Sequence, residues 1–485
     1  MKNAVLITAD SLRYDLLSAD GDPETTPFLD KLAEDGVFFE NAVPTGPGTS
    51  SSFPGILASA LPLEHGYRGL NSAHQPVAEQ LQQSGVRTLG LSSSTHVSSL
   101  YGYNRGFHKF DEPSIEGTEE NSGRDVKKAV FDFADSIPVV RNIGRQLIRY
   151  IRSFKRDIQG VERPYELAED ITNRAVEMIR TDIEAYPDQP RFVWVGYMEP
   201  HSPPYPPEKY VKIFHDGEFN RTEIHELWKR WSRQRPPLWD ETAETDAMSI
   251  LTTNEVAALR DYYRAQARYL DDELKRFVES LEQLGIRDET AVLFTTDHGE
   301  EFFEHGDLGH RQKLYDELVH VPLIASAGGE AWNAQDYTGT ISLLDLAPTI
   351  ADLLDVEPAA EWQGQSFTSV LQGGTHERKY AISELSHRGS DGYGGDVRLE
   401  DVVMSVRTAD WKYIRNKQKG SEELYDLSTD MAEEQNVLEA YPSTSSKLST
   451  IVEDRIKSLS DRRVVNVDIS ADVREQLQEL GYTGE

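Results

Sequence analysis

The chain contains 485 residues, carries a formal net charge of −33 and has no cysteine. The strong acidity disfavours nonspecific binding to nucleic acid, because two polyanions repel each other, and it indicates an acidic, halophilic proteome. The lack of cysteine excludes disulfides, iron–sulfur clusters, thiolate metal sites and a cysteine nucleophile. Any metal ion would therefore need aspartate, glutamate, histidine or hydroxyl ligands.

This length exceeds what one ordinary hydrophobic core supports, so we expect a large domain and a smaller one. No segment offers the roughly 20 consecutive apolar residues of a membrane-spanning helix. The first residues lead directly into an apolar strand pattern, without the features of a signal peptide. We therefore expect a cytoplasmic protein.

Strand and helix patterns alternate up to about residue 380. This order predicts βαβ units and an α/β fold with a mostly parallel sheet between two layers of helices. The expected strands lie at 4–8, 88–91, 191–197 and 291–294, and the expected helices at 27–35, 166–183 and 254–284.

The pattern changes near residue 380 to short strands separated by turns, followed by helices. Such a run predicts a small antiparallel sheet with helices. We therefore divide the chain into a large α/β domain at 1–380 and a small C-terminal α+β domain at 381–485. The expected strands are 402–407, 411–415 and 423–426, and the expected helices are 446–458 and 473–480.

Two insertions interrupt the alternation, at about 115–165 and 205–250. In the first, apolar residues recur every three or four positions over 137–158 with arginines between them, which predicts a basic amphipathic helix. Such a helix can make a peripheral contact with an anionic membrane, but packing against this protein's own acidic surface is the favoured alternative. The second insertion mixes tryptophans, arginines and prolines at 228–239, which predicts either a substrate lid or a turn anchored by its tryptophans.

The most informative motif is Asp297-His298-Gly299, which follows the apolar strand at 291–294. Ligands of open α/β sheets bind beyond the carboxyl ends of strands, and Asp10 follows the first strand in the same way. A carboxylate beside a neutral imidazole suits Zn²⁺ or Mn²⁺, whereas a site richer in oxygen would suit Ca²⁺ or Mg²⁺. The alternative for both aspartates is an ordinary helix N-cap.

Two further segments offer groups for chemistry at such a site. Glycines and prolines bend the chain before a hydroxyl cluster at 49–52 that begins a helix, and a helix N-terminus attracts anions. Metal coordination would lower the pKa of such a hydroxyl and make it a nucleophile. His201 follows the strand at 191–197, between prolines, and can contact an anionic oxygen or protonate a leaving group. The alternatives are capping hydroxyls and a structural histidine in a turn.

These motifs, in this order, resemble the sulfatase family within the alkaline phosphatase superfamily. The resemblance implies an alkaline phosphatase-like sheet sandwiched by helices, with a small C-terminal domain, so that 1–380 would be the catalytic part. The similar segments include Asp10-Ser11-Leu12-Arg13-Tyr14-Asp15, Leu61-Pro62-Leu63-Glu64-His65-Gly66, Pro200-His201-Ser202-Pro203, Thr296-Asp297-His298-Gly299, Leu344-Asp345-Leu346-Ala347-Pro348-Thr349 and Glu423-Leu424-Tyr425-Asp426.

The resemblance implies that Asp10, Asp297 and His298 bind one divalent cation, whether Mn, Zn, Ca or Mg. Thr49 lies where the family usually has the cysteine or serine that is converted to formylglycine. The resemblance therefore makes Thr49 the nucleophile and a further ligand of the cation.

The resemblance also implies which residues contact the transferred group. His201 matches a family histidine with this task. Arg311 lies where the family often has a lysine on the sulfate or phosphate oxygens, and His310 beside it is a second candidate for that position.

The chain departs from the family pattern around Thr49. Formylglycine formation requires a proline or alanine two positions after the modified residue and an arginine two positions after that. Counted from Thr49, this chain has Ser51 and Phe53 at those positions. We therefore expect no formylglycine. Ser11 replaces a frequent second aspartate, and 92–95 stands where many members have Gly-Lys-Trp-His. An unmodified threonine beside an Asp-His pair is similar to the phosphonate monoester hydrolases and lipoteichoic-acid synthases.

These features predict a metal-dependent hydrolase of sulfate or phosphate esters, including phosphodiesters, with a threonine nucleophile. The ester would belong to a small molecule, a glycan or a lipid head group. One alternative is a transferase that moves a phosphoryl or phosphoglycerol-type group onto a membrane lipid or cell-surface glycan, with the helix at 137–158 as its docking face. Another is a binding protein without catalytic activity, which would hold no metal.

Overall fold

The computed structural model describes residues 1–17, 24–65, 69–70, 72–112, 165–234, 250–328, 332, 336–386 and 399–461. Residues 1–112 and 167–485 belong to one compact unit, which contains every element named below. The predicted helices at 137–158 and 473–480 lie outside the described residues, as does the end of the tryptophan-rich segment, from 235 to 239.

Eight strands of the described residues form the main sheet, in the order β10-β2-β9-β6-β1-β5-β3-β4. All neighbours are parallel except β9, which runs antiparallel to both β6 and β2. The predicted mostly parallel α/β sheet is confirmed. The strands are β1 (Asn3–Asp10), β2 (Val37–Val43), β3 (Arg87–Ser92), β4 (Lys109–Asp111), β5 (Arg191–Pro200), β6 (Thr290–Thr296), β9 (Val321–Ala327) and β10 (Tyr337–Ser342).

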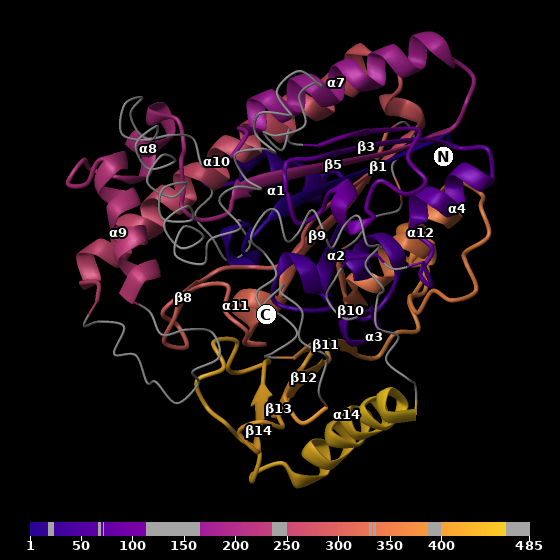
Figure 1. The fold of residues 1–485 in the computed structure, drawn as a ribbon. Helices are drawn as coiled ribbons and strands as arrows, with labels where there is room; N and C mark the ends of the chain where they lie inside the picture. Colours follow the sequence, from indigo (N-terminus) through magenta and orange to yellow (C-terminus); the bar gives the residue numbers. More distant parts are fainter. Residues whose placement is uncertain are drawn as a thin grey trace, which may run out of the picture. The chain divides into compact units, whose positions relative to one another are not determined.

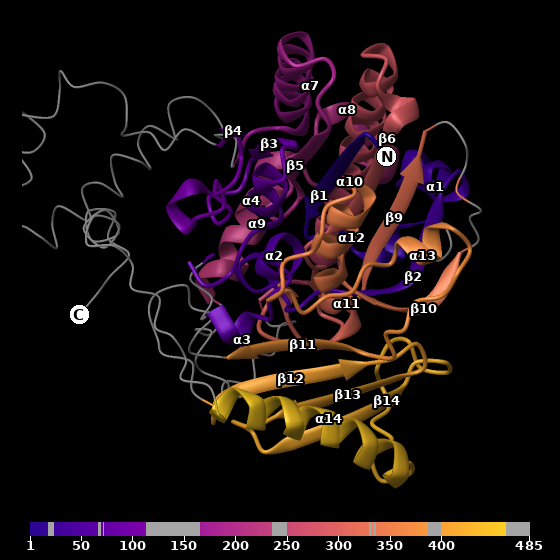
Figure 2. The ribbon, with the colours of Figure 1, turned by 90° about the vertical axis from the view of Figure 1, so that its right-hand side faces the viewer.

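Helices cover both faces of this sheet, because its central strands bury side chains on both sides (Figure 1 and Figure 2). On β1, Val5 and Ile7 join a core with α1, α7 and α10, while Ala4 and Leu6 join a second core with α2, α4 and α12. The helices are α1 (Pro27–Glu34), α2 (Thr49–Ala58), α3 (Pro62–His65), α4 (Val77–Gln83), α7 (Ala168–Ala185), α8 (Glu208–Phe214), α9 (Arg221–Gln234), α10 (Thr253–Gln283), α11 (Asp316–Val319), α12 (Leu346–Leu353) and α13 (Thr368–Leu371).

The C-terminal part is a four-stranded antiparallel sheet covered by one helix (Figure 2). The three predicted strands are present, and a fourth precedes them at the edge that faces the main sheet. Leu448 and Val452 of the helix share a core with Val403 and Tyr413 of the sheet. The proposed domain boundary at 380 stays a prediction. The elements are β11 (Ala381–Ser386), β12 (Val402–Arg407), β13 (Trp411–Asn416), β14 (Ser421–Asp426) and α14 (Pro442–Asp461).

The strand β11 supports the segment that carries Thr49. Its Glu384 N–H donates to the carbonyl of Thr45 at 2.9 Å, and its carboxylate accepts the N–H of Leu63 at 2.8 Å. Arg455 of α14 pairs with the same carboxylate at 2.9 Å and with Glu64 at 2.6 Å. The C-terminal sheet and helix therefore hold the chain on both sides of α2.

A buried charge cluster joins α11 to the C-terminal sheet. Lys412 Nζ lies 2.7 Å from Asp316 Oδ1 and 3.0 Å from Glu433 Oε1, and Arg407 Nε lies 3.0 Å from Asp316 Oδ2. Burial alone would raise the pKa of Asp316, but the two cations outweigh burial and hold the pKa below its ordinary value. Breaking one partner of such a cluster leaves a buried charge unpaired.

Among the described residues, none of the helices combines the length and apolarity needed to span a membrane.

The long helix α10 fixes the start of α1 through Asp271. This buried carboxylate accepts the N–H groups of Phe28 and Leu29 at 2.9 and 2.8 Å, which satisfies two donors that a helix N-terminus leaves unpaired. We expect Asp271→Ala to lower the free energy of unfolding by about 1–3 kcal/mol, measured by urea denaturation. Glu279→Ala, on the exposed side of α10, should change it by less than about 0.5 kcal/mol. Equal effects of the two variants would contradict this capping role.

Candidate active site and metal centre

The register of two central strands brings Asp10 and Asp297 together. In the parallel pair β1 and β6, Ala9 lies opposite Thr296, and the N–H of Asp297 donates to the carbonyl of Ala9 at 3.3 Å. The two aspartates are the next residues on their strands, and both are buried. Two carboxylates are thereby placed at the carboxyl edge of the sheet, where open α/β folds bind ligands.

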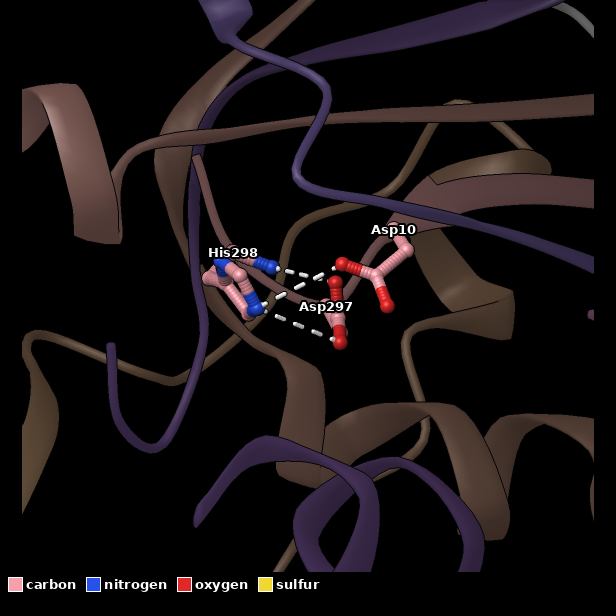
Figure 3. Close-up of side chains that lie close together, drawn as sticks. All are labelled: Asp10, Asp297 and His298. Atoms are coloured by element: carbon pink, nitrogen blue, oxygen red, sulfur yellow. Dashed lines mark hydrogen bonds and ion pairs between the residues drawn. The ribbon is translucent and has the colours of Figure 1, made fainter. Parts of the chain in front are cut away.

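His298 completes a compact group of possible metal ligands (Figure 3). Its Nε2 lies 3.7 Å from Asp10 Oδ1 and 3.5 Å from Asp297 Oδ2. Its Nδ1 lies 2.8 Å from the carbonyl of Gly299 and must donate a proton there, which leaves the Nε2 lone pair facing the carboxylates. One ligand atom from each residue lies within 4.8 Å of the other two.

The electrostatics of this group fit a bound cation. Burial raises the pKa of Asp10 well above its ordinary value, and the charge of Asp297 adds to this effect. Burial also raises the pKa of Asp297 to about 7 and lowers that of His298 to about 3. Asp297 Oδ2 and His298 Nε2 are buried and have no hydrogen-bond partner among the described residues. Two carboxylates and a neutral imidazole with unused lone pairs form a donor set suited to a divalent metal.

Ser11 holds both carboxylates in place. Its N–H donates to Asp297 Oδ1 at 3.3 Å, and its hydroxyl donates to Asp10 Oδ1 at 2.8 Å. The residue adopts a left-handed backbone with φ of 66°, which is uncommon outside glycine and is typical of functional sites. The serine that departs from the family's frequent aspartate therefore orients the site.

Thr49 is the first residue of α2, and it lies against the metal group. Its side chain lies near enough to Asp10 and Asp297 to oppose in part the rise in their pKa values. The N-cap Gly48 has an extended backbone, so the chain enters the helix directly at Thr49. The structure thus brings the predicted nucleophile and the predicted ligands together, at the positive end of a helix dipole.

Two predicted histidines form the next layer of the site. The ring of His310 lies 4.5 Å from that of His298 and 5.1 Å from that of His201, measured between centroids. His201 directly follows β5, and burial lowers its pKa to about 3. His310 Nδ1 lies 2.8 Å from Glu300 Oε2. Burial would raise the pKa of Glu300, but His310 outweighs burial and brings that pKa below its ordinary value.

Arg311 forms an ion pair with Asp307, in which Nη1 of the arginine lies 3.1 Å from Oδ2 of the aspartate. Its guanidinium therefore already balances a buried carboxylate. The role predicted for Arg311 on the transferred group stays a prediction, and His310 is the neighbour for which ring contacts with His201 and His298 are found.

The helix α9 supports the loop that carries His310. Trp231 is buried, donates from Nε1 to the carbonyl of Leu308 at 3.1 Å and meets the ring of Phe303 edge-on at 5.0 Å. A Cβ at Gly309 would lie 3.5 Å from Trp228. In the described part of the second insertion, the tryptophans therefore act as anchors; the lid alternative concerns residues outside that part.

Sequence reasoning missed two residues of the site. Glu300 follows the recognised motif by one residue, and a buried acid so close to a metal motif was the available signal. His96 lies near enough to His201 to lower the pKa of His201, and desolvation and the charge of His310 lower the pKa of His96 itself. It follows the carboxyl end of β3, at Ser92, by four positions, and so comes from the same edge of the sheet.

Two family models match this chain. The family model described as Sulfatase matches residues 2–356, and the one described as N-sulphoglucosamine sulphohydrolase, C-terminal, matches residues 303–462. Arylsulfatase K of Homo sapiens is 24% identical, covering 93% of this chain and 82% of that protein.

Solved structures show the same fold at low identity. The phosphonate monoester hydrolase of Agrobacterium radiobacter is 21% identical with a TM-score of 0.67, covering 95% of each chain. The protein BT4656, solved in complex with its substrate D-glucosamine-2-N,6-O-disulfate, is 18% identical with a TM-score of 0.67, covering 95% of this chain and 98% of that one.

Binding of a divalent cation to Asp10, Asp297 and His298 should weaken as the pH falls below about 7. The raised pKa of Asp297 means that a proton competes with the metal below that pH, whereas His298 is already neutral. We expect the affinity for Mn²⁺ to fall about tenfold per pH unit for each proton displaced, measured by isothermal titration calorimetry. Asp297→Asn should bind weakly and keep only the part of this dependence that Asp10 contributes. An affinity that stays constant between about pH 5 and pH 8 would contradict the assignment.

Proposed function

The chain belongs to the sulfatase family within the alkaline phosphatase superfamily, as its motifs predict, and is an ester hydrolase of that family. From this premise we propose that it hydrolyses sulfate or phosphate esters with a divalent cation and with Thr49 as the nucleophile. The observation that carries the proposal is the position of Thr49, at the N-terminus of α2, where its side chain lies near enough to Asp10 and Asp297 to lower the pKa of both.

In this proposal, Asp10, Asp297, His298 and the Thr49 hydroxyl hold the cation. When bound, the cation would neutralise charge on the transferred group and lower the pKa of the Thr49 hydroxyl. The first N–H groups of α2 would add positive potential at the same point.

The reaction then needs a nucleophile, contacts to the remaining oxygens and a proton donor. The Thr49 hydroxyl loses its proton to water as Oγ attacks sulfur or phosphorus, the bond to the leaving oxygen breaks, and that oxygen takes the electron pair and a proton from His310. Water cleaves the resulting Thr49 ester and releases sulfate or phosphate. His201, His310 and Arg311 are the proposed contacts of the non-reacting oxygens.

The proposed substrate is an ester on a small molecule or a glycan. The C-terminal family match and the sulfated glucosamine bound by one structural neighbour support a sugar-borne group, and the phosphonate monoester hydrolase keeps phosphoryl chemistry open. Lipid head groups and the transferase alternative stay predictions, because the helix at 137–158 lies outside the described residues.

Replacing Thr49 provides the direct test. Thr49→Ala should lower kcat/KM for p-nitrophenyl sulfate or phosphate, whichever is hydrolysed, by at least about 10³-fold, because it removes the attacking oxygen. Thr49→Ser keeps a hydroxyl and should retain most of the activity. Ser50→Ala, which removes the neighbouring hydroxyl, is the matched control and should leave the rate nearly unchanged.

The same proteins also test the absence of formylglycine. Intact-mass measurement should show an unmodified Thr49, and quenched turnover should show a transient increase by one sulfo or phospho group in the wild type and none in Thr49→Ala. Undiminished hydrolysis by Thr49→Ala would end the proposal. A purified protein that hydrolyses no ester and holds no metal by elemental analysis would favour the alternative of a binding protein.

A further inference from the structure

Glu300 is a buried carboxylate that fold stability does not explain. Its side chain is fully buried, and no lysine or arginine among the described residues pairs with it. Its Oε1 has no hydrogen-bond partner in that part of the chain. Burying a carboxylate without a permanently charged partner is destabilising, so a residue kept in this state points to a role in the reaction.

The Glu300 carboxylate is hydrogen-bonded to the Nδ1 atom of His310. Its Oε2 lies 2.8 Å from Nδ1 of His310, whose ring contacts those of His298 and His201. A carboxylate that takes the proton of one imidazole nitrogen fixes both the tautomer and the orientation of the ring. The Nε2 atom of His310, on the opposite side of the ring, is then the nitrogen turned away from Glu300.

We propose that Glu300 is a positioning residue, which holds the His310 ring so that Nε2 faces the transferred group. This inference rests on the proposed function, because it requires His310 to contact the substrate.

A second glutamate–histidine pair in the same region provides a matched control. His305 Nδ1 lies 2.7 Å from Glu317 Oε1, and the pair is also largely shielded from solvent. The ring of His305 stacks on Tyr315, with centroids 3.6 Å apart, and takes no part in the group around Asp297. This pair has the same chemistry as Glu300 and His310, but lies outside the proposed site.

The test is a double-mutant cycle with Glu300→Gln and His310→Ala. Glu300→Gln alone should lower kcat/KM by about 10–100-fold, mainly through kcat, as is typical when the partner of a functional histidine is lost. In the His310→Ala background the same change should cost less than about twofold, because the ring that Glu300 positions is absent. Glu317→Gln should change kcat/KM by less than about threefold, although it removes an equivalent pair.

Two further measurements separate positioning from folding. Each variant should keep its Mn²⁺ affinity within about threefold and its urea midpoint close to that of the wild type. Glu300→Asp keeps the charge but retracts the carboxylate, so it should lose activity as Glu300→Gln does. This variant also provides the test if Glu300→Gln fails to fold.

The outcomes distinguish this inference from the proposed function. If Glu300→Gln lowers kcat/KM by the same factor in both backgrounds, Glu300 acts independently of His310 and the inference is wrong, while Thr49 chemistry is untouched. If His310→Ala alone leaves kcat/KM unchanged, the inference is wrong as well. Undiminished activity of Thr49→Ala would instead overturn the proposed function itself.

Discussion

The mutual repulsion of two buried carboxylates is the constraint around which the rest of the site is built. The register of β1 and β6 places Asp10 beside Asp297, and burial removes the water that would screen them. Ser11 donates hydrogen bonds to this pair, Thr49 lies near enough to lower the pKa of both carboxyls, and His298 turns an unprotonated nitrogen toward them. Without a cation, the repulsion between the two carboxylates would destabilise the site. A bound cation removes this repulsion, so the pair attracts one.

Sequence patterns predicted the parts of the site that lie at strand ends. A strand that is buried on both faces must be hydrophobic until it leaves the core. The end of such an apolar run therefore indicates Asp10 and Asp297 as the residues at the edge of the sheet. Their adjacency could not be predicted in this way, since 286 residues separate Ser11 from Asp297 and only strand order joins them. The family resemblance supplied Thr49, and the structure places it near Asp10 and Asp297.

Other features escaped prediction because they depend on how distant loops meet. Glu300 and His96 became recognisable only when loops after β6 and β3 converged on His201 and His310. The strand β9 is antiparallel to β6 because the chain between them begins and ends at the same edge of the sheet, which no residue pattern indicates. The strand β11 was missed because a strand pattern is weak where Glu384 is buried to bind Arg455.

The support that β11 and α14 give to the Thr49 segment can form only after these elements have been synthesised. The ribosome makes residues 44–64 early, but it makes Glu384 and Arg455, which hold both ends of that segment, only after several hundred more residues. The segment that carries Thr49, the proposed nucleophile, therefore gains its support late in synthesis. A nascent or truncated chain that lacks the C-terminal sheet would carry Asp10, Asp297 and His298, the proposed metal ligands, while the Thr49 segment lacked this support.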